Sequence, residues 1–360
     1  MFYDHPALKP IKDLLVDPEI TEIMINGPKR LFVERKGRME PVGQRFANEQ
    51  QVQFLVARML EPTGRSVSTA FPYTDFRLPD GSRVNVTIPP IALDGTMVTI
   101  RKFTKHLTKV EDLVRLGTLS ERMASFLCAA IRGRLNIIFA GAAGTGKTTT
   151  LGILSGHIPE SERIITIEDT AELTLQQKHV VRLECRPPNQ EGKGAVTLSQ
   201  LMRNSLRMRP TRIIVGEIRG EEAVDMLQAI STGHEGCLAV LHASSPMDAV
   251  SRLEMMSLSR GLLLPLWAIQ KQIASAIDLI VQHEFLTDGA RKITRIAELC
   301  GAEDDHIALH DVFEFHRHGQ DDSGRVLGEW TCDGVRSNVL MKCERIGAEV
   351  PLGTLRVDRA

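Results

Sequence analysis

The sequence predicts an α/β protein: a mainly parallel sheet covered by helices, with a smaller α+β domain before it and a β-rich extension after it. Three observations carry this prediction. From Glu121 onward, short apolar strands alternate with helix-like segments, which is typical of a parallel sheet. Before Lys109, and again after Ile277, short β-branched segments follow one another and are separated by Gly, Pro or Asp.

The length of the chain and the changes of pattern along it indicate several domains. With 360 residues, the chain exceeds what one hydrophobic core usually organises. A polar and basic stretch from Lys102 to Lys109 is a candidate linker. The expected parts are an N-terminal α+β domain over residues 1–102, a linker over residues 103–118, a central α/β domain over residues 119–290 and a C-terminal β-rich extension over residues 291–360.

Individual elements follow from the periodicity of apolar residues. Helices are expected from Gln50 to Leu60 and from Glu121 to Arg132. The N-terminal strands are EIMING (22–27), RLFVER (30–35), TDFRL (74–78), RVNVTI (83–88) and MVTIRKF (97–103). The central strands are NIIFA (136–140), RIITIE (163–168), HVVRLE (179–184), RIIVGE (212–217) and LAVLHA (238–243). The last strands are DLIVQHEF (278–285), RKITRIAEL (291–299), HIALHDVFEF (306–315) and VLGEWTC (326–332).

The composition is that of an ordinary soluble protein and disfavours several classes. Hydrophobic residues make up 42% of the chain and charged residues 25%. The formal net charge of −1 gives no overall attraction to nucleic acid or to an anionic membrane, so no direct nucleic-acid partner is expected. Six cysteines without a C-x-x-C pair disfavour a zinc ribbon or a disulfide scaffold and favour reduced thiols in the cytoplasm.

No targeting or membrane-spanning segment is expected. The first residues lack a positive region followed by an uninterrupted apolar stretch, so no signal peptide is predicted. The longest apolar region, residues 261–281, is interrupted by Gln270, Lys271, Gln272 and Asp278 and is interpreted as a helix followed by a strand. Any association with a membrane is therefore expected to run through partner proteins or an exposed surface.

The most informative motif is a phosphate loop. Residues 141–148 read G-A-A-G-T-G-K-T between an apolar strand and a helix-forming segment, which matches G-x-x-x-x-G-K-T at every fixed position. The glycines permit a tight backbone that turns N–H groups towards phosphate oxygens. Lys147 is expected to reach the β- and γ-phosphates of ATP and Thr148 the Mg²⁺ ion. The candidate nucleotide-binding residues are Gly141, Ala142, Ala143, Gly144, Thr145, Gly146, Lys147, Thr148 and Thr149.

Glu217 is the candidate that polarises the attacking water. It follows the apolar run Ile213 to Val215, so its carboxylate is expected at the C-terminal edge of the sheet, where α/β proteins bind ligands. A carboxylate placed beside Mg²⁺ at this edge orients water for in-line attack on the γ-phosphate. The alternative is a glutamate that caps the following helix.

A second apolar strand also ends in acidic residues, Glu168 and Asp169. Both are candidate Mg²⁺ ligands, directly or through water, because Mg²⁺ prefers oxygen ligands and keeps part of its hydration shell. Glu172, three residues further on, is a weaker candidate, for which a solvated turn position is a serious alternative.

Two histidines and several arginines complete the candidate site. His234 and His242 flank the strand at 238–243 and are candidates for sensing the phosphate, although a lone histidine is more often structural. Arginine stabilises charge on a transferred phosphoryl group, even from another subunit. The candidates are Arg77, Arg83 and Arg101 in N-terminal strands, and Arg207 and Arg209 before the Glu217 strand; each alone is more often a solvated surface residue.

Four ordered segments together resemble the nucleotide-site motifs of the secretion and pilus ATPase superfamily. They are GAAGTGKTTTL (141–151), TIEDTAEL (166–173), SLRMRPTRIIVGEIRGEEA (205–223) and TGHEGCLAVLHASSP (232–246), corresponding to Walker A, acidic box, Walker B and histidine box. Within this superfamily the chain looks most like the ATPases of tight-adherence (Flp, type IVc) pilus assembly. That likeness rests on LECRPPNQEGKG (183–194), EIMINGP (22–28), VERKGR (33–38), LPDGSRVNVTIPP (78–90) and SRLEMM (251–256) followed by QIASAIDLIVQ (272–282).

The resemblance covers nearly all of residues 10–316 and implies a Mg²⁺-dependent ATPase. Its fold would be a RecA-like P-loop core with a small PAS-like N-terminal domain. The implied assembly is a homohexameric ring in the cytoplasm, peripheral at the inner membrane, whose domain movements act on platform proteins of a pilus or secretion system. The resemblance also implies that Glu217 acts in hydrolysis, that Glu168 and Asp169 form the acidic box and His234 and His242 the histidine box, and that Arg83 and Arg101 close over the nucleotide, across a subunit interface.

The sequence departs from the family pattern at three positions without a chemical role: Cys185, Thr211 and Ser244. A close alternative within the superfamily is a type IV secretion ATPase that moves DNA or protein. A nucleic-acid translocase is disfavoured by the neutral charge and by the lack of an aromatic and basic binding strip. A nucleotide-binding scaffold that scarcely hydrolyses ATP is the third alternative.

Overall fold

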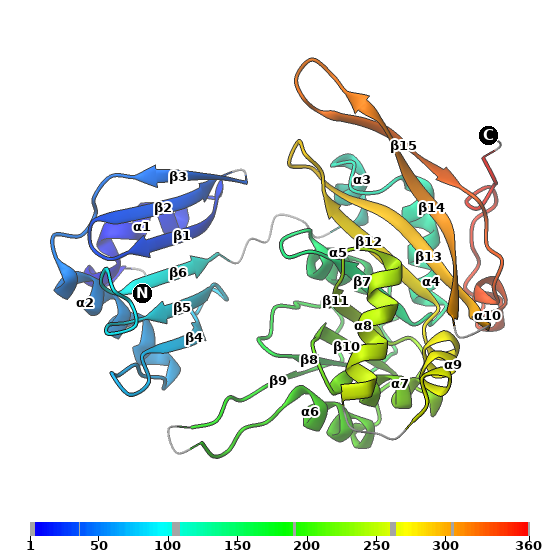
Figure 1. Cartoon of the computed structure of the whole chain (residues 1–360), viewed down its shortest axis with the longest axis horizontal. Coiled ribbons are helices and arrows are strands. Elements are labelled where there is room, and N and C mark those ends of the chain that lie inside the picture. Colours follow the sequence, from blue (N-terminus) through cyan, green and yellow to red (C-terminus); the bar gives the residue numbers. More distant parts are fainter. Residues whose placement is uncertain are drawn as a thin grey trace. The chain divides into compact units, whose positions relative to one another are not determined.

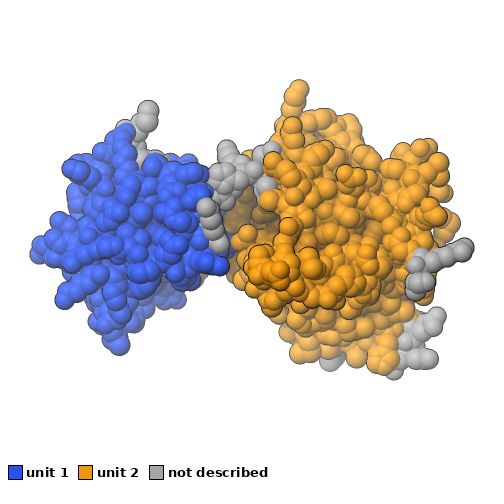
Figure 2. All heavy atoms as spheres, turned by 90° about the horizontal axis from the view of Figure 1, so that it is seen from above, with its two compact units in different colours: residues 1–106 blue, residues 107–360 orange. Residues whose placement is uncertain are grey.

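The computed structural model describes residues 4–35, 37–102, 109–189, 192–259, 264–303 and 306–358. The chain divides into two compact units, residues 1–106 and 107–360, which Figure 2 colours separately. Residues 103–108, the first part of the expected linker, lie outside the described residues.

Unit 1 consists of an antiparallel sheet and helices that share a buried core with it. The sheet order is β3-β2-β1-β6-β5-β4. Its elements are η2 (Pro6–Ile11), α1 (Lys12–Val16), β1 (Ile20–Asn26), β2 (Arg30–Arg35), β3 (Arg38–Val42), α2 (Glu49–Leu60), η3 (Glu61–Thr63), β4 (Tyr73–Arg77), β5 (Arg83–Thr87) and β6 (Met97–Arg101). Helix α2 begins where the Asn48 side chain accepts a hydrogen bond from the Gln51 N–H.

The sequence predicted the α+β class of unit 1 and all of its strands except β3. Strand β3 (Arg38–Val42) was not predicted from the sequence because it contains Pro41 and is exposed along most of its length. It is an edge strand, paired only with β2, and such strands lack the alternating apolar pattern that identifies a strand in a sequence.

Unit 2 is built on one large mixed sheet with the order β15-β14-β13-β12-β7-β11-β10-β8-β9 (Figure 1). The block from β12 to β9 is parallel, and β12 to β15 are antiparallel. The strands are β7 (Ile137–Gly141), β8 (Ile164–Glu168), β9 (Val180–Glu184), β10 (Arg212–Ile218), β11 (Leu238–His242), β12 (Leu279–Phe285), β13 (Arg291–Glu303), β14 (His306–Gln320) and β15 (Val326–Cys332). The predicted α/β class and the predicted strands are confirmed.

Helices cover both faces of this sheet. They are α3 (Val110–Arg115), α4 (Glu121–Arg132), α5 (Lys147–Ser155), α6 (Leu198–Ser205), η4 (Leu206–Met208), α7 (Glu222–Ser231), α8 (Pro246–Ser259), α9 (Leu266–Ala276) and α10 (Val339–Arg345). Successive residues of a strand point to opposite faces of the sheet. Phe139 belongs to the core formed with α4 and α5, and Ala140 belongs to the core formed with α7, α8 and α9. A strand buried on both sides is apolar throughout, which made these strands visible in the sequence.

The C-terminal β-rich extension continues the large sheet. Strand β13 pairs with β12, which in turn pairs with β7, the strand that leads into the phosphate loop. Helix α10 packs its Cys343 against α4 in the same core. Among the described residues, no helix combines the length and the apolar composition needed to cross a bilayer.

Candidate nucleotide-binding site

The phosphate loop connects β7 to α5 at the C-terminal edge of the parallel strands. Gly141 has φ +149° and lies against the backbone of His283 on β12, so that a Cβ at this position would overlap the His283 carbonyl. The loop ends at Gly146, and α5 begins with Lys147. A strand, a glycine loop and a helix N-terminus therefore meet here as the sequence predicted.

The residues of the loop differ in their exposure to solvent. Ala142, Ala143 and Gly144 are exposed at the tip. Lys147 is only 5% exposed, and its Nζ donates a hydrogen bond of 2.6 Å to the Ala142 carbonyl oxygen. The lysine therefore lies folded over the loop, within reach of an anion bound there. Of the remaining candidates on the loop and α5, Thr148 is half-buried, Thr149 exposed and Thr145 buried.

Glu217 lies at the same edge and is held by two neighbours. Its Oε2 accepts a hydrogen bond of 2.7 Å from Arg219 Nη2, and its Oε1 is 3.1 Å from His242 Nε2. Strand β11 pairs with β7 so that His242 lies opposite Gly141, which brings the histidine to the phosphate loop. The alternative of Glu217 as a helix cap is wrong, because Glu222 Oε1 accepts the N–H groups of Arg219 and Gly220 ahead of α7.

The pKa values of Glu217 and His242 both respond to the charge of Lys147, which indicates that the three residues belong to one site. Burial acts to raise the pKa of Glu217, but the Arg219 hydrogen bond and the positive charges of Arg219 and Lys147 outweigh it, so the pKa lies below its ordinary value. Burial and the charge of Lys147 lower the pKa of His242. At neutral pH the site therefore holds an ionised carboxylate and a neutral imidazole.

Glu168 has contacts that differ from those expected of a Mg²⁺ ligand. Its side chain is buried, and its Oε2 accepts hydrogen bonds from the N–H groups of Glu172 (2.6 Å) and Leu173 (2.9 Å). This oxygen therefore fixes the turn after β8, and the role of Glu168 as a Mg²⁺ ligand stays a prediction. Asp169 is exposed, and its Oδ2 lies 3.5 Å from Arg219 Nη1, which links it to Glu217.

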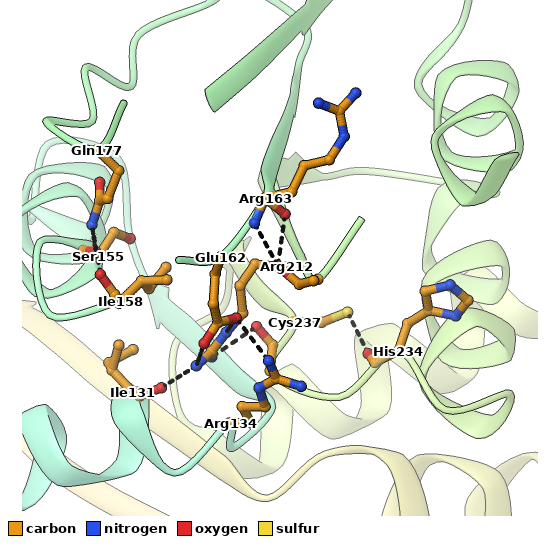
Figure 3. A network of polar contacts seen from close by, with 12 residues as sticks. Ile131, Arg134, Ser155, Ile158, Glu162, Arg163, Gln177, Arg212, His234 and Cys237 are labelled. Atoms are coloured by element: carbon orange, nitrogen blue, oxygen red, sulfur yellow. Dashed lines mark hydrogen bonds and ion pairs between the residues drawn. The ribbon is translucent and has the colours of Figure 1, made fainter. Parts of the chain in front are cut away.

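His234 lies at the other end of β11 from His242. It precedes the strand, where the N–H groups of Gly236 and Cys237 donate to Asn136 Oδ1 ahead of β7. The structure therefore separates the two histidines: of this pair, His242 lies beside the loop, and a phosphate-sensing role for His234 stays a prediction. In Figure 3 the His234 ring points away from the polar network around it, while its carbonyl accepts a bond from the Cys237 thiol.

That polar network is centred on the buried pair of Arg212 and Glu162 (Figure 3). Arg212 Nε lies 2.7 Å from Glu162 Oε2, and Arg212 Nη2 donates to the Ile131 carbonyl at 2.7 Å. Arg134 Nη2 adds a second cation 3.3 Å from Glu162 Oε2. Gly236, with φ +82°, packs against the guanidinium so closely that a Cβ there would overlap it. The network lies at the start of β10, opposite the phosphate loop, as do the exposed Arg207 and Arg209.

The three candidate arginines of unit 1 form one cross-strand row. Arg101 on β6 is the direct partner of Arg83 on β5, and Arg83 is the direct partner of Arg77 on β4. Glu22 continues the row on β1, with 3.8 Å between its Oε1 and Arg101 Nε. Like charges directly opposite one another destabilise a sheet, so three adjacent arginines are a feature that a bound anion would stabilise.

Arg219 is the residue of this site that the sequence analysis missed. It contacts both Glu217 and Asp169, and these carboxylates raise its pKa. The available signal was its spacing, because a residue two positions after Glu217 near the end of a strand has its side chain on the same side.

Comparisons with known proteins agree with this geometry. The family described as Type II/IV secretion system protein matches residues 5–322. A Mycobacterium tuberculosis protein whose name associates it with conjugal transfer is 32% identical over 324 residues, covering 84% of this chain and 92% of the relative. Protein VirB11 of Agrobacterium fabrum is 32% identical over 305 residues, covering 76% and 87%.

Solved structures show the same fold. The pilus retraction motor PilT with bound ADP superposes with a TM-score of 0.57 at 20% identity, covering 80% of each chain. The Legionella pneumophila ATPase DotB gives a TM-score of 0.53 at 21% identity, covering 76% of this chain and 75% of its own. The RecA-like fold is therefore shared, and by its family match and its relatives the chain belongs to the Type II/IV secretion system protein family.

Proposed function

We propose that this chain is a Mg²⁺-dependent ATPase that powers pilus assembly or secretion from the cytoplasmic side of the inner membrane. The observation that carries the proposal is the arrangement of Glu217, His242 and Lys147 around the phosphate loop at one edge of the sheet. This edge is where parallel α/β sheets bind ligands.

The proposal assigns a task to each residue of the candidate site. The loop N–H groups and Lys147 hold the phosphates of ATP, and Thr148 with Glu168 and Asp169, directly or through water, would hold Mg²⁺. When bound, Mg²⁺ neutralises charge on the β- and γ-phosphates. Glu217 orients the attacking water as an ionised carboxylate, and the neutral His242 beside it presents a hydrogen-bonding nitrogen to the same region.

The arginine row of unit 1 supports a site completed by that unit. Arg83 and Arg101, with Arg77 beside them, would stabilise the negative charge of the transferred phosphoryl group. We propose that this happens across the subunit interfaces of a homohexameric ring, in which ATP favours one arrangement of the units over another through its differential affinity. Platform proteins of the inner membrane are the proposed partners, and they would hold the ring there.

A tight-adherence pilus motor is the specific function favoured by the sequence motifs. A type IV secretion ATPase that moves DNA or protein is the second candidate, because VirB11 and the Bordetella pertussis type IV secretion system protein PtlH are both relatives. PtlH is 33% identical over 293 residues, covering 74% of this chain and 86% of its own length. Co-purification with pilin platform proteins, as opposed to a secretion channel, separates the two.

The proposal is tested by steady-state ATP hydrolysis over a range of protein concentrations, with and without Mg²⁺. We expect activity per chain to rise with concentration as the ring forms and to vanish when Mg²⁺ is chelated or in Lys147→Ala. Sedimentation of the same samples reports whether the active species is a hexamer. Wild-type activity equal to that of Lys147→Ala would contradict the proposal and favour a scaffold. Salt-sensitive stimulation by single-stranded DNA would favour a translocase.

Arg219 provides a prediction on pH dependence. Glu217 acts as a carboxylate, so hydrolysis falls as the pH drops through its pKa, which Arg219 helps to hold below the ordinary 4.5. In Arg219→Gln the hydrogen bond and the charge are lost while burial remains, so the pKa rises and the acid limb of kcat/KM moves to higher pH. Arg219→Lys keeps the charge and should shift the limb less. The profile is measured from about pH 4 to 8, where circular dichroism shows folded protein; an unchanged limb in Arg219→Gln would disprove this role.

A further inference from the structure

The hairpin between β12 and β13 lies beside the phosphate loop and carries no residue of the proposed hydrolytic machinery. Phe285 ends β12, Arg291 begins β13, and the two are direct cross-strand partners. The guanidinium carbon of Arg291 lies 4.8 Å from the centroid of the Phe285 ring, which is a cation–π arrangement. Phe285 nevertheless remains 43% exposed.

Both side chains contact the outer wall of the phosphate loop. Arg291 Nε donates a hydrogen bond of 2.8 Å to the Gly144 carbonyl oxygen. A Cβ built on Gly144 would be 3.6 Å from Phe285 Cε2, and one built on Gly146 would be 3.6 Å from Arg291 Cδ. The ring and the guanidinium therefore adjoin the loop at two of its glycines.

The hairpin is held firmly by the rest of the sheet. The Asp288 carboxylate accepts hydrogen bonds from the N–H of Ala290 at 2.9 Å and from the N–H of Val326 on β15 at 2.8 Å. These bonds lower the pKa of Asp288. Leu286 is buried in a small core with Phe315 and Val326. These contacts hold the hairpin that carries Phe285 in place, as a preorganised binding surface requires.

We propose that Phe285 and Arg291 form the seat for the purine base of the nucleotide whose phosphates the loop binds. The inference rests on the proposed function and specifies how the base is held. Anchoring of the phosphates at the loop brings the base to its wall, where Arg291 covers one side of the aromatic ring and leaves apolar surface exposed. An aromatic face binds a base by stacking, in a manner that depends little on its edge groups. The seat therefore selects a purine nucleotide over a bare polyphosphate.

The test compares ADP with pyrophosphate, which carries the same phosphates without base or ribose. Calorimetric titrations with Mg²⁺ are made on the wild type, Phe285→Ala and Phe285→Trp. In Phe285→Ala we expect ADP to bind roughly 5- to 100-fold more weakly and pyrophosphate to bind as in the wild type. Phe285→Trp should keep tight ADP binding. Thr287→Ala is the matched control, because Thr287 lies in the same hairpin and contacts Gln320 on β14.

Two outcomes would contradict the proposal that Phe285 and Arg291 bind the base. Equal weakening of ADP and pyrophosphate in Phe285→Ala would mean that the ring only braces the loop. Unchanged ADP binding in that variant would mean that the base lies elsewhere. A failure of the proposed function looks different, because neither ligand would then bind in the wild type in a manner that Lys147→Ala abolishes.

Discussion

Replacing Glu217 with glutamine is expected to lower the kcat of ATP hydrolysis by roughly 100- to 10,000-fold, the usual contribution of a positioned general base. The wild-type carboxylate is ionised, half-buried and aligned by Arg219 and His242 at the mouth of the phosphate loop. Glutamine keeps the shape of the side chain but has neither the charge nor the second acceptor oxygen that orients water. Binding of ATP should change little, because Lys147 and the loop carry the phosphates.

The measurement is single-turnover hydrolysis beside equilibrium binding of a fluorescent ATP analogue. Glu221→Gln is the matched control, because Glu221 is exposed four residues away and makes no capping hydrogen bond through its side chain. Lys147→Ala should lose binding as well as turnover, which separates the two roles. A Glu217→Gln protein that hydrolyses ATP within a few-fold of the wild-type rate would remove Glu217 from the mechanism.

Replacing Arg212 with alanine is expected to reduce the free energy of unfolding by about 3 to 5 kcal/mol, because it leaves a buried carboxylate without its main partner. The Arg212 side chain is 0% exposed and that of Glu162 only 7%. The substitution also removes the donor to the Ile131 carbonyl and the group against which Gly236 packs. Arg134 remains near Glu162, and its partly exposed charge compensates for only part of the loss.

The measurement is the free energy of unfolding of the wild type, Arg212→Ala and the control variant Arg207→Ala, obtained by chemical denaturation. Arg207 is exposed in the turn before the same strand, and its removal should change stability by no more than about 0.5 kcal/mol. A double variant in which apolar residues replace both Arg212 and Glu162 should recover much of the stability, since no buried charge is then stranded. If Arg212→Ala unfolds at the denaturant concentration of the wild type, the network does not stabilise the fold.

Whether a residue of the candidate site could be predicted from the sequence depends on whether it belongs to a local motif. The phosphate loop and Glu217 were found because each follows an apolar strand directly, and the C-terminal ends of parallel strands share one edge. His234 and His242 are equally close to a strand, yet one precedes it and the other ends it. Placing them required the direction of β11, and of the two only His242 lies at the edge that carries the phosphate loop.

Glu168 and Arg219 show a second limit. Glu168 ends a strand just as Glu217 does, but its Oε2 turns back to the N–H groups of Glu172 and Leu173. Arg219 was overlooked because an arginine near a strand end is usually solvated, and only its contacts with Glu217 and Asp169 distinguish it. Side-chain direction after the last strand residue depends on the turn, which composition and spacing do not specify.

The α/β class, almost every strand and the phosphate loop can be predicted from the sequence, because they depend on apolar runs and on glycines at fixed local spacing. Contacts between distant residues follow only from the folded chain. It brought His242 and Arg219 to Glu217, aligned three arginines across β4, β5 and β6, and placed Phe285 and Arg291 on the wall of the loop. Strand order and register fix such contacts, and both depend on the packing of the whole sheet.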